Sequence, residues 1–348
     1  MMKSRKLLLF RNIVILVLSL VFLAGGGACL YADSLLNRIH YVLPNESETS
    51  GENLFQTAST QSGANAKSGI VGGLYHDDAV INILMLGTDD YQQNDVGRSD
   101  SMMLVSVDTR HKKLKITSFM RDMYVAVPGL GSHKLCEAYS LSGGQEKGIR
   151  KVILTLEANF GIDIDRFVKV DFSKFPGIID RLGGVEIKLT NETNSNGITE
   201  AGLINAYSGD SRKVRPGVVN NLSGLQARYY SRIRDIGNDQ ERTERQRKVF
   251  TSAVNKMKSS NLLTIYGVLH DTFPLILTNM QKNEIEGMLA NSLTYLNYPL
   301  SQNRVPAEGE YTNIKNEAGD CLGVDLDKCR QTLAKFIYEN DIPSGSYS

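Results

Sequence analysis

Two arginines stand between two predicted helices near the middle of the sequence. Arg232 and Arg234 lie between helices predicted at 225–231 and 239–258. Because they are two residues apart, their side chains point to the same side if the segment between the helices is extended. Planar guanidinium groups bind carboxylate and phosphate through paired hydrogen bonds, so two converging arginines indicate an anion site.

A second pair of arginines lies on one stripe of the longer helix. At helical spacing the stripe also carries a glutamine and two apolar residues, and its members are Arg242, Arg245, Gln246, Val249 and Ala253. Glu244 and Lys248 form an i,i+4 pair on another face, as on a solvated surface. Arginines on an inward face need anionic partners, because a buried unpaired charge is strongly destabilising. We therefore expect a phosphate pocket where this helix begins, since backbone N–H groups there also favour anions; a solvated basic face is the alternative.

Two aspartates flank the first predicted strands. Asp89 follows the strand predicted at 80–86, and Asp100 precedes the strand predicted at 102–108. Ligands of α/β proteins usually bind at strand ends, so we expect both carboxylates at one edge of the sheet. Carboxylates beside phosphate commonly share a magnesium ion, with manganese as the second candidate; ordinary turn aspartates are the alternative. Arg121 ends the third predicted strand and reaches the same edge.

Motifs of several other chemistries are absent from the sequence. It contains no phosphate-binding loop of the form GxxxxGKS or GxxxxGKT, no GxSxG, no SxxK and no HExxH, and its five histidines are scattered without metal-ligand spacing. A serine nucleophile and a zinc site are therefore poorly supported. The net charge of +1 gives no overall basic field that would attract nucleic acid. These observations favour chemistry by arginine, aspartate and a hard metal ion.

Strand and helix patterns alternate along most of the sequence. Strands are predicted at 80–86, 102–108, 114–119, 123–127, 167–170 and 185–189, and helices at 148–160, 175–182, 225–231, 239–258, 284–296 and 325–339. This order predicts an α/β fold with a central mixed β-sheet flanked by helices. We expect one domain over 79–348, with its motifs in 81–250 and a helical extension over 261–348.

The amino terminus predicts a membrane anchor. A basic tail over 1–12 precedes an uncharged apolar run over 13–32, which is long enough for one transmembrane helix. Basic residues remain on the cytoplasmic side, so the rest of the chain is expected outside the cytoplasm. A cleaved signal peptide is the alternative. The polar composition of 33–78 predicts a flexible linker.

Two cysteines lie close together in the part predicted to be exported. Cys321 and Cys329 are eight residues apart, in a compartment where disulfides form. A disulfide between them and two unpaired thiols are both compatible with the sequence.

Several short segments together resemble the LytR-CpsA-Psr family of bacterial cell-envelope enzymes. The resemblance runs from about 81 to 250, and its order and spacing are specific; the segments are 82–90, 97–104, 118–122, 134–139, 222–227, 230–234 and 242–246. One departure is Cys136, which stands where the family usually has Asn.

The resemblance implies a phosphotransferase with the α-β-α fold of that family. Its substrate would be a glycopolymer (teichoic acid, capsule or similar) linked through pyrophosphate to a polyprenyl carrier, and its acceptor a sugar hydroxyl of peptidoglycan. Asp89 and Asp100 would hold magnesium, and Asp100, Arg121 and Arg98 would be catalytic. The pyrophosphate would be bound by Arg98, Arg121, Arg232, Arg234, Arg242, Arg245 and Gln246. A tunnel for the lipid would be lined by Val152, Leu156, Phe160, Phe175 and Ile179.

Two other functions fit the same residues. A polyprenyl-pyrophosphate phosphatase would use water as the acceptor in the same pocket. A non-catalytic sensor or attenuator would bind lipid-linked glycans and would not need Asp89 and Asp100 for its role. DNA binding is disfavoured, because the basic helix is expected outside the cytoplasm.

Overall fold

The computed structural model of the chain describes most of the sequence after the predicted anchor. The described residues are Ser34, 36–42, 68–71, 74–88, 96–171, 174–237, 239–260 and 262–339. The predicted tail and span over 1–32, and the predicted metal ligand Asp89, lie outside these ranges. Among the helices within these ranges, none combines the length and the apolar character needed to cross a bilayer.

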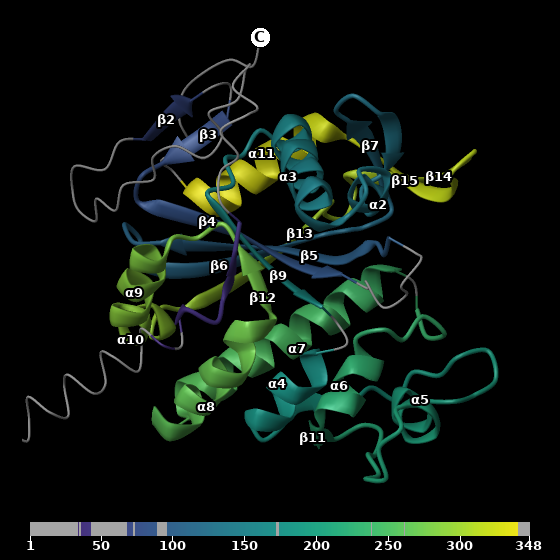
Figure 1. Cartoon of the computed structure of the whole chain (residues 1–348). Helices are drawn as coiled ribbons and strands as arrows, with labels where there is room; N and C mark the ends of the chain where they lie inside the picture. The colour runs from purple at the N-terminus through teal and green to yellow at the C-terminus, as the bar shows by residue number, and fades with distance from the viewer. Residues whose placement is uncertain are drawn as a thin grey trace, which may run out of the picture.

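A seven-stranded mixed sheet forms the centre of the molecule (Figure 1). Its strands, in spatial order, are β1 (His40–Tyr41), β12 (Ile276–Thr278), β9 (Arg166–Asp171), β4 (Val80–Thr88), β5 (Ser99–Asp108), β6 (Lys113–Phe119) and β13 (Leu300–Val305). The three central strands β4, β5 and β6 pair antiparallel, whereas β9 runs parallel to β4 and β13 parallel to β6. The prediction of an α/β fold with a mixed sheet is confirmed.

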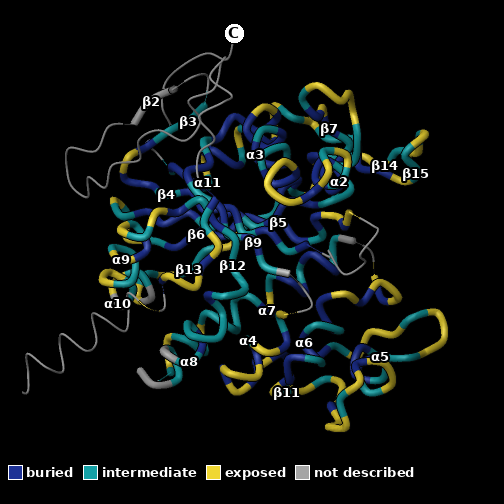
Figure 2. Tube along the Cα trace, viewed as in Figure 1, coloured by how far each residue is buried: buried dark blue, intermediate teal, exposed yellow. Residues whose placement is uncertain are grey.

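Helices cover both faces of this sheet (Figure 1). On one face lie α3 (Gln145–Phe160) and α11 (Leu326–Tyr338), which enclose the main core with Leu84 and Leu104 of the sheet. On the other face lie α7 (Asp239–Ser259), α8 (Leu262–Thr272), α9 (Lys282–Ala290) and α10 (Ser292–Leu296). Figure 2 shows that the buried positions are concentrated in the central strands and the helix sides that face them.

The remaining elements form smaller units around the sheet. One unit is a four-stranded sheet of β14 (Tyr311–Asn316), β15 (Gly319–Val324), β7 (Met123–Val127) and β8 (Gly131–Lys134), beside α2 (Glu137–Leu141). A second contains β10 (Val185–Lys188), β11 (Val219–Leu222), α4 (Phe175–Arg181), α5 (Glu200–Tyr207) and α6 (Gly224–Tyr230). β2 (Ser68–Val71) and β3 (Leu74–Asp77) form a hairpin, and a short 3-10 turn, Phe273–Leu275, follows α8.

The segment predicted as a flexible linker contains ordered strands. β1 pairs with β12 at the edge of the central sheet, and β3 forms a bridge from Tyr75 to Ile162. Leu36 and Ile39, beside β1, are buried. The prediction over 33–78 was therefore wrong for its described parts, because a few apolar residues in a polar segment suffice to attach it to the domain.

The region after 261 is part of the core and not a helical extension. It supplies β12 and β13 to the central sheet, as well as β14 and β15. β13 has the sequence Leu-Ser-Gln-Asn-Arg-Val, which shows no regular alternation of apolar and polar residues. The sequence pattern for a strand was therefore too weak to be recognised here.

Lys115 is a buried cation that connects the sheet to the last helix. Its Nζ donates to Oδ2 of Asp108 and to the carbonyl of Ile337, both at 2.6 Å, and its side chain is 2% exposed. We expect Lys115→Met to lower the free energy of unfolding by about 3–5 kcal/mol, because buried Asp108 loses its closest cation.

Chemical denaturation of the purified protein measures this effect. Lys113→Met is the matched control, because its ion pair with Glu339 is partly exposed and is expected to contribute about 1 kcal/mol or less. Equal losses in the two variants would contradict the assignment of the buried contact.

Candidate functional site

A β-bulge places Asp100 at the edge of the central sheet. Gly87 pairs with Ser101, but Thr88 pairs with Ser99, so Asp100 is one extra residue in β5. Such a residue leaves the regular ladder, and bulges often re-aim a side chain beside an active site. Asp100 is thereby directed towards arginines from two other elements.

Asp100 lies between Arg121 and Arg242. Nη1 of Arg121 donates to Oδ1 of Asp100 at 2.6 Å, and Oδ2 of Asp100 lies 3.4 Å from Nη2 of Arg242. The backbone carbonyl of Asp100 also accepts from Nη2 of Arg242 at 3.3 Å and from Nε2 of Gln246 at 3.5 Å. Arg121 follows β6, whereas Arg242 and Gln246 come from α7, so the predicted meeting of these residues is found in the structure.

The charges around Asp100 keep its carboxyl ionised. Burial raises the pKa of this carboxyl, but the positive charges of Arg242, Arg121 and Arg234 outweigh burial, and the pKa is lowered below its ordinary value. A carboxylate in this environment can orient guanidinium groups and accept a metal ion, but it holds a proton weakly.

The predicted inward stripe of α7 is confirmed. Arg242 is 2% exposed, and Arg245, Gln246 and Val249 are also buried. On another side of the helix, Glu244 and Lys248 form the expected i,i+4 ion pair at 2.8 Å, and both are exposed. The arginines of the stripe are therefore buried at the side of the helix that faces Asp100.

Arg245 has partners that differ from the expected pyrophosphate. Its Nε donates to Oε1 of buried Glu200 at 2.8 Å, and its two terminal nitrogens donate to the carbonyls of Ile233 and Ile236 at 3.1 and 2.7 Å. All three guanidinium nitrogens are thus engaged by the protein. These contacts let Arg245 hold the segment 231–237; its direct contact with phosphate stays a prediction.

The other predicted arginines lie at the exposed side of the site. Arg232 and Arg234 are exposed on the segment that Arg245 holds. Arg98, just before β5, is 58% exposed and lies 3.8 Å from Glu137. Arg121, by contrast, is largely buried, and Asp122 lies 3.6 Å from its Nε, as an orienting neighbour would. The site therefore has buried arginines at its base and exposed arginines at its rim.

The residues of the site fit a hard cation. Oδ1 of Asp100 is held by Arg121, but Oδ2 is farther from Arg242 and is the oxygen that a metal ion would take. Asp89 itself is outside the described residues, but it follows Thr88, which pairs with Ser99 beside Asp100. Ionised carboxylate oxygen is a preferred ligand of magnesium.

The residues predicted to line a lipid tunnel do not lie together. Val152, Leu156 and Phe160 of α3 are fully buried in the core on one face of the sheet. Phe175 and Ile179 of α4 belong to another cluster, which includes Val249 of α7. The prediction of one tunnel lined by all five residues was wrong, because apolar residues at helical spacing here form ordinary core.

Accessible apolar surface lies instead on the sheet face towards α7 and α8. Met85 pairs with Met103 on β5 and with Val168 on β9, and all three are only half-buried although they lie in central strands. The neighbouring Ile83 contributes to a cluster with Leu36, Ile39 and Phe273. Incomplete burial in the middle of a sheet leaves apolar surface that a chain-like lipid can contact.

Of the two alternatives for Cys321 and Cys329, the structure shows the unpaired thiols. Cys321 and Cys329 are both free and buried, and Sγ of Cys321 lies 3.5 Å from Oδ1 of Asn316. Burial raises the pKa of the Cys329 thiol to about 12. Cys136, the departure from the family pattern, is also buried, and its backbone carbonyl accepts from Oγ of Ser99 at 3.4 Å. The residue at 136 thus supports β5 through its backbone.

Two charged residues near the site were missed from the sequence. Glu200, the partner of Arg245, starts a helix 45 residues earlier in the chain, so no local pattern could pair them. Lys169 of β9 is buried, with its Nζ 5.7 Å from the ring centre of Tyr139. Lys169 and Phe167 point to the same face of β9, and Phe167 is part of the core. Lysine is rarely buried, so a lysine at a core position of a predicted strand could have been recognised in the sequence.

Curated relatives of this chain are bacterial. The chain is 29% identical over 229 residues to a protein of Oceanobacillus iheyensis named polyisoprenyl-teichoic acid–peptidoglycan teichoic acid transferase TagU, and the match covers 64% of the chain and 65% of that relative. It is also 29% identical over 280 residues to the regulatory protein MsrR of Staphylococcus aureus strain Mu50, with 77% of each covered.

Solved structures have the same fold. A structure titled "TagT bound to LIIa-WTA" matches with a TM-score of 0.59 at 20% identity, over 74% of this chain and 91% of that one. The crystal structure of Bacillus subtilis TagT matches with a TM-score of 0.58 at 21% identity, over 76% and 91%. A structure of the protein YwtF (TagT) with bound octaprenyl pyrophosphate lipid matches with a TM-score of 0.55 at 21% identity, over 74% and 90%.

The family assignment rests on the longest of these matches. The profile of the LytR_cpsA_psr family covers residues 45–335, which include the central sheet from β4 onwards, Asp100, Arg121 and the whole of α7. This span exceeds half of the chain and includes the region after 261 that supplies β12 and β13. The chain belongs to the LytR-CpsA-Psr family.

Proposed function

We propose that this protein is a magnesium-dependent phosphotransferase that moves a glycopolymer from a polyprenyl-pyrophosphate carrier to a sugar hydroxyl of peptidoglycan, forming a phosphodiester. The observation that carries the proposal is the ionised Asp100 between Arg121 and Arg242, beside the first turns of α7. Relatives named as teichoic acid transferases support the reaction class. The polymer is proposed as a class, teichoic acid or capsule.

The arginines would bind the pyrophosphate and neutralise its charge. Phosphoryl transfer depends more on positioning and charge neutralisation than on a covalent nucleophile. Arg121 and Arg242, already held by Asp100, are oriented before the substrate arrives. Arg232, Arg234 and Arg98 at the rim would close over the phosphates, and the backbone N–H groups of α7 would add donors.

Asp100 would act through its charge and its position. The carboxylate orients Arg121, and its second oxygen, together with Asp89, would hold magnesium. When bound, that ion would neutralise phosphate oxygens and act as a Lewis acid. The lowered pKa of Asp100 favours this role over storage of a proton.

The lipid chain would lie against the accessible apolar face of the sheet. Met85, Met103 and Val105 are half-buried there, below the bulge that carries Asp100. Leu36 and Ile39 reach the same side of the sheet and precede β1, which begins at His40. The proposed membrane span ends at 32, eight residues before His40, so a lipid leaving the bilayer would meet this face directly.

We further propose that 13–32 anchors the protein in the cell membrane, with the amino terminus in the cytoplasm and the domain outside. This topology is supported by the basic tail and the apolar run of the sequence. It would place the pocket on the side of the membrane where peptidoglycan is assembled.

A regulatory protein that binds lipid-linked glycans without catalysis is the second candidate. It is favoured by one observation, the match to relatives named regulatory protein MsrR. The same pocket would then bind its ligand, but no polymer would be transferred.

Removal of Arg121 tests the proposed reaction. We expect Arg121→Ala to reduce transfer about 10²–10³-fold, because a preorganised charged donor is lost from the site. The measurement is magnesium-dependent release of polyprenyl phosphate from a lipid-pyrophosphate-linked glycan, with capture of polymer-bound peptidoglycan.

Controls separate the three candidate functions. Arg215→Ala, an exposed arginine outside the site, should retain wild-type activity. Release without peptidoglycan-bound product would support the phosphatase, and lipid binding without release would support the regulatory protein. Either result would sink the transferase proposal.

Arg245 and Arg232 should differ in how their loss acts. Arg245→Ala leaves buried Glu200 without its cation, so we expect a loss of about 3–5 kcal/mol in the free energy of unfolding. Arg232→Ala is expected to change stability by about 0.5 kcal/mol or less while lowering transfer.

Denaturant unfolding and the transfer assay on both variants measure this difference. The double variant Arg245→Met with Glu200→Gln should recover stability, because the uncompensated carboxylate is removed. If Arg245→Ala keeps full stability but no longer binds substrate, Arg245 would instead contact the pyrophosphate directly, as the sequence predicted.

A further inference from the structure

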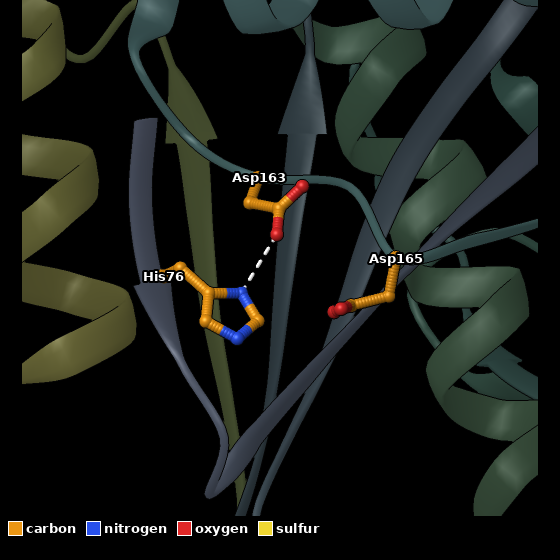
Figure 3. Close-up of side chains that lie close together, drawn as sticks. All are labelled: His76, Asp163 and Asp165. Carbon is orange, nitrogen blue, oxygen red and sulfur yellow. Dashed lines mark hydrogen bonds and ion pairs between the residues drawn. The ribbon is translucent and has the colours of Figure 1, made fainter. Parts of the chain in front are cut away.

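A second cluster of charged side chains lies at the opposite end of the central strands. It contains His76 of β3 with Asp163 and Asp165, which lie between α3 and β9 (Figure 3). Oδ2 of Asp165 accepts from the backbone N–H of Asn82 at 2.7 Å, which places the cluster beside the start of β4. Asn82 precedes Thr88 by six residues, so about 20 Å of strand separates this cluster from the Asp100 site.

The geometry of the cluster suits a metal ion. His76, Asp163 and Asp165 can each offer one ligand atom, and these atoms all lie within 4.8 Å of one another. Nδ1 of His76 is 2.7 Å from Oδ2 of Asp163. In Figure 3, the Asp163 and Asp165 carboxylates approach the imidazole ring of His76 from different sides. The three ligands come from two segments that are far apart in sequence.

Asp78 contacts the other ring nitrogen of His76. Its Oδ1 lies 2.9 Å from Nε2 of His76 and accepts a hydrogen bond when Nε2 carries the proton. In the neutral ring, the lone pair of Nδ1 then faces Asp163. The lone pairs of His76 Nδ1 and Asp163 Oδ2 repel each other at 2.7 Å unless a cation or a proton lies between them. A carboxylate that orients a metal-binding histidine in this way is a common outer-shell partner.

Asp165 is the more deeply buried of the two carboxylates in the cluster. Its side chain is 9% exposed, and within the described part of the chain its carboxylate has one hydrogen bond, from Asn82 to Oδ2. In Figure 3 the carboxylate of Asp165 is directed towards the imidazole ring of His76. A buried carboxylate needs a compensating charge or hydrogen bonds, and a cation bound together with His76 and Asp163 would supply the charge.

Nearby arginines do not fill this role. Arg166 donates to Glu284 through Nε at 2.9 Å and to the backbone carbonyl of Asp165. Arg110 donates to Asp77 at 2.9 Å. The cluster thus combines two carboxylates with one histidine, and Asp78 adds a third carboxylate beside it.

We propose that His76, Asp163 and Asp165 bind a divalent transition-metal ion, Zn²⁺ or Mn²⁺, at a site separate from the Asp100 pocket. Imidazole together with carboxylates selects these ions over magnesium and calcium. Tetrahedral binding would require Nδ1 and Oδ2 to separate to roughly 3.3 Å. The sequence disfavoured a zinc site because the ligands show no local spacing, and it is the fold that brings them together.

The metal would attach β3 to the body of the domain. This strand already contacts the segment after α3, because the Tyr75 N–H donates to the Gly161 carbonyl at 2.8 Å and the Asp163 N–H donates to the Tyr75 carbonyl at 3.1 Å. Tyr338 of α11 donates to the same Tyr75 carbonyl at 2.8 Å. A metal bound by residues of both segments would fix the hairpin that precedes the central sheet.

Calorimetric titration of Zn²⁺ and Mn²⁺ into the chelator-treated full-length protein in detergent tests this site. Besides any ion at the proposed Asp89 and Asp100 site, wild type should bind one ion per chain whose binding His76→Gln and Asp163→Asn weaken by at least about tenfold and Asp78→Asn weakens about 10–100-fold. X-ray absorption of the zinc-loaded protein should show a shell of oxygen and nitrogen with one imidazole.

His111→Gln is the matched control, because His111 also contacts a carboxylate, Asp108, but Lys115 already neutralises that group. This variant should bind the ion as wild type does, and Asp100→Asn should retain the ion whose binding depends on His76, which separates this site from the proposed catalytic one. Circular dichroism confirms that each variant is folded. Absence of saturable binding in wild type, or equal binding by folded His76→Gln, would overturn the proposal and leave a protonated His76 between Asp163 and Asp78.

Discussion

The contact between Asp100 and the arginines of two other elements is the interaction on which the site depends. One carboxylate at a bulge in β5 holds Arg121, which follows β6, and faces Arg242 of α7. These charges are buried, so each is tolerated only because the others are present. The arrangement holds guanidinium groups at the sheet edge before any phosphate binds, which reduces the cost of ordering them at the moment of binding.

A second buried ion pair organises the exposed side of the site. Arg245 joins Glu200 to the carbonyls of Ile233 and Ile236, and so fixes the segment that carries Arg232 and Arg234. Arg242 and Arg245, on one stripe of α7, therefore have different roles. Arg242 faces Asp100, whereas Arg245 holds the segment that carries Arg232 and Arg234. On the sheet face beside them, Met85 and Met103 are half-buried, on the side that also carries Leu36 and Ile39.

Sequence patterns predicted the features that depend on residues close together in the chain, and failed for contacts between residues far apart in sequence. The stripe of α7 and the α/β order followed from spacing along the chain. The partner of Arg245, the strand β13 and the cluster around His76 could not be predicted, because their contacts join residues far apart in sequence. The expected tunnel failed for another reason: apolar residues at helical spacing do not distinguish core from the wall of a cavity.

The most direct test of the central claim is calorimetric binding of a short prenyl pyrophosphate to the wild-type protein and its arginine variants. Arg234→Ala, at an exposed position, and Arg242→Met should each weaken binding, by about 1.5–3 kcal/mol for each charged hydrogen bond lost. The double variant Asp100→Asn with Arg242→Met should show coupling of about 0.5–3 kcal/mol between the two residues. Unchanged affinity in folded Arg234→Ala and Arg242→Met would show that pyrophosphate binds elsewhere and would contradict the account.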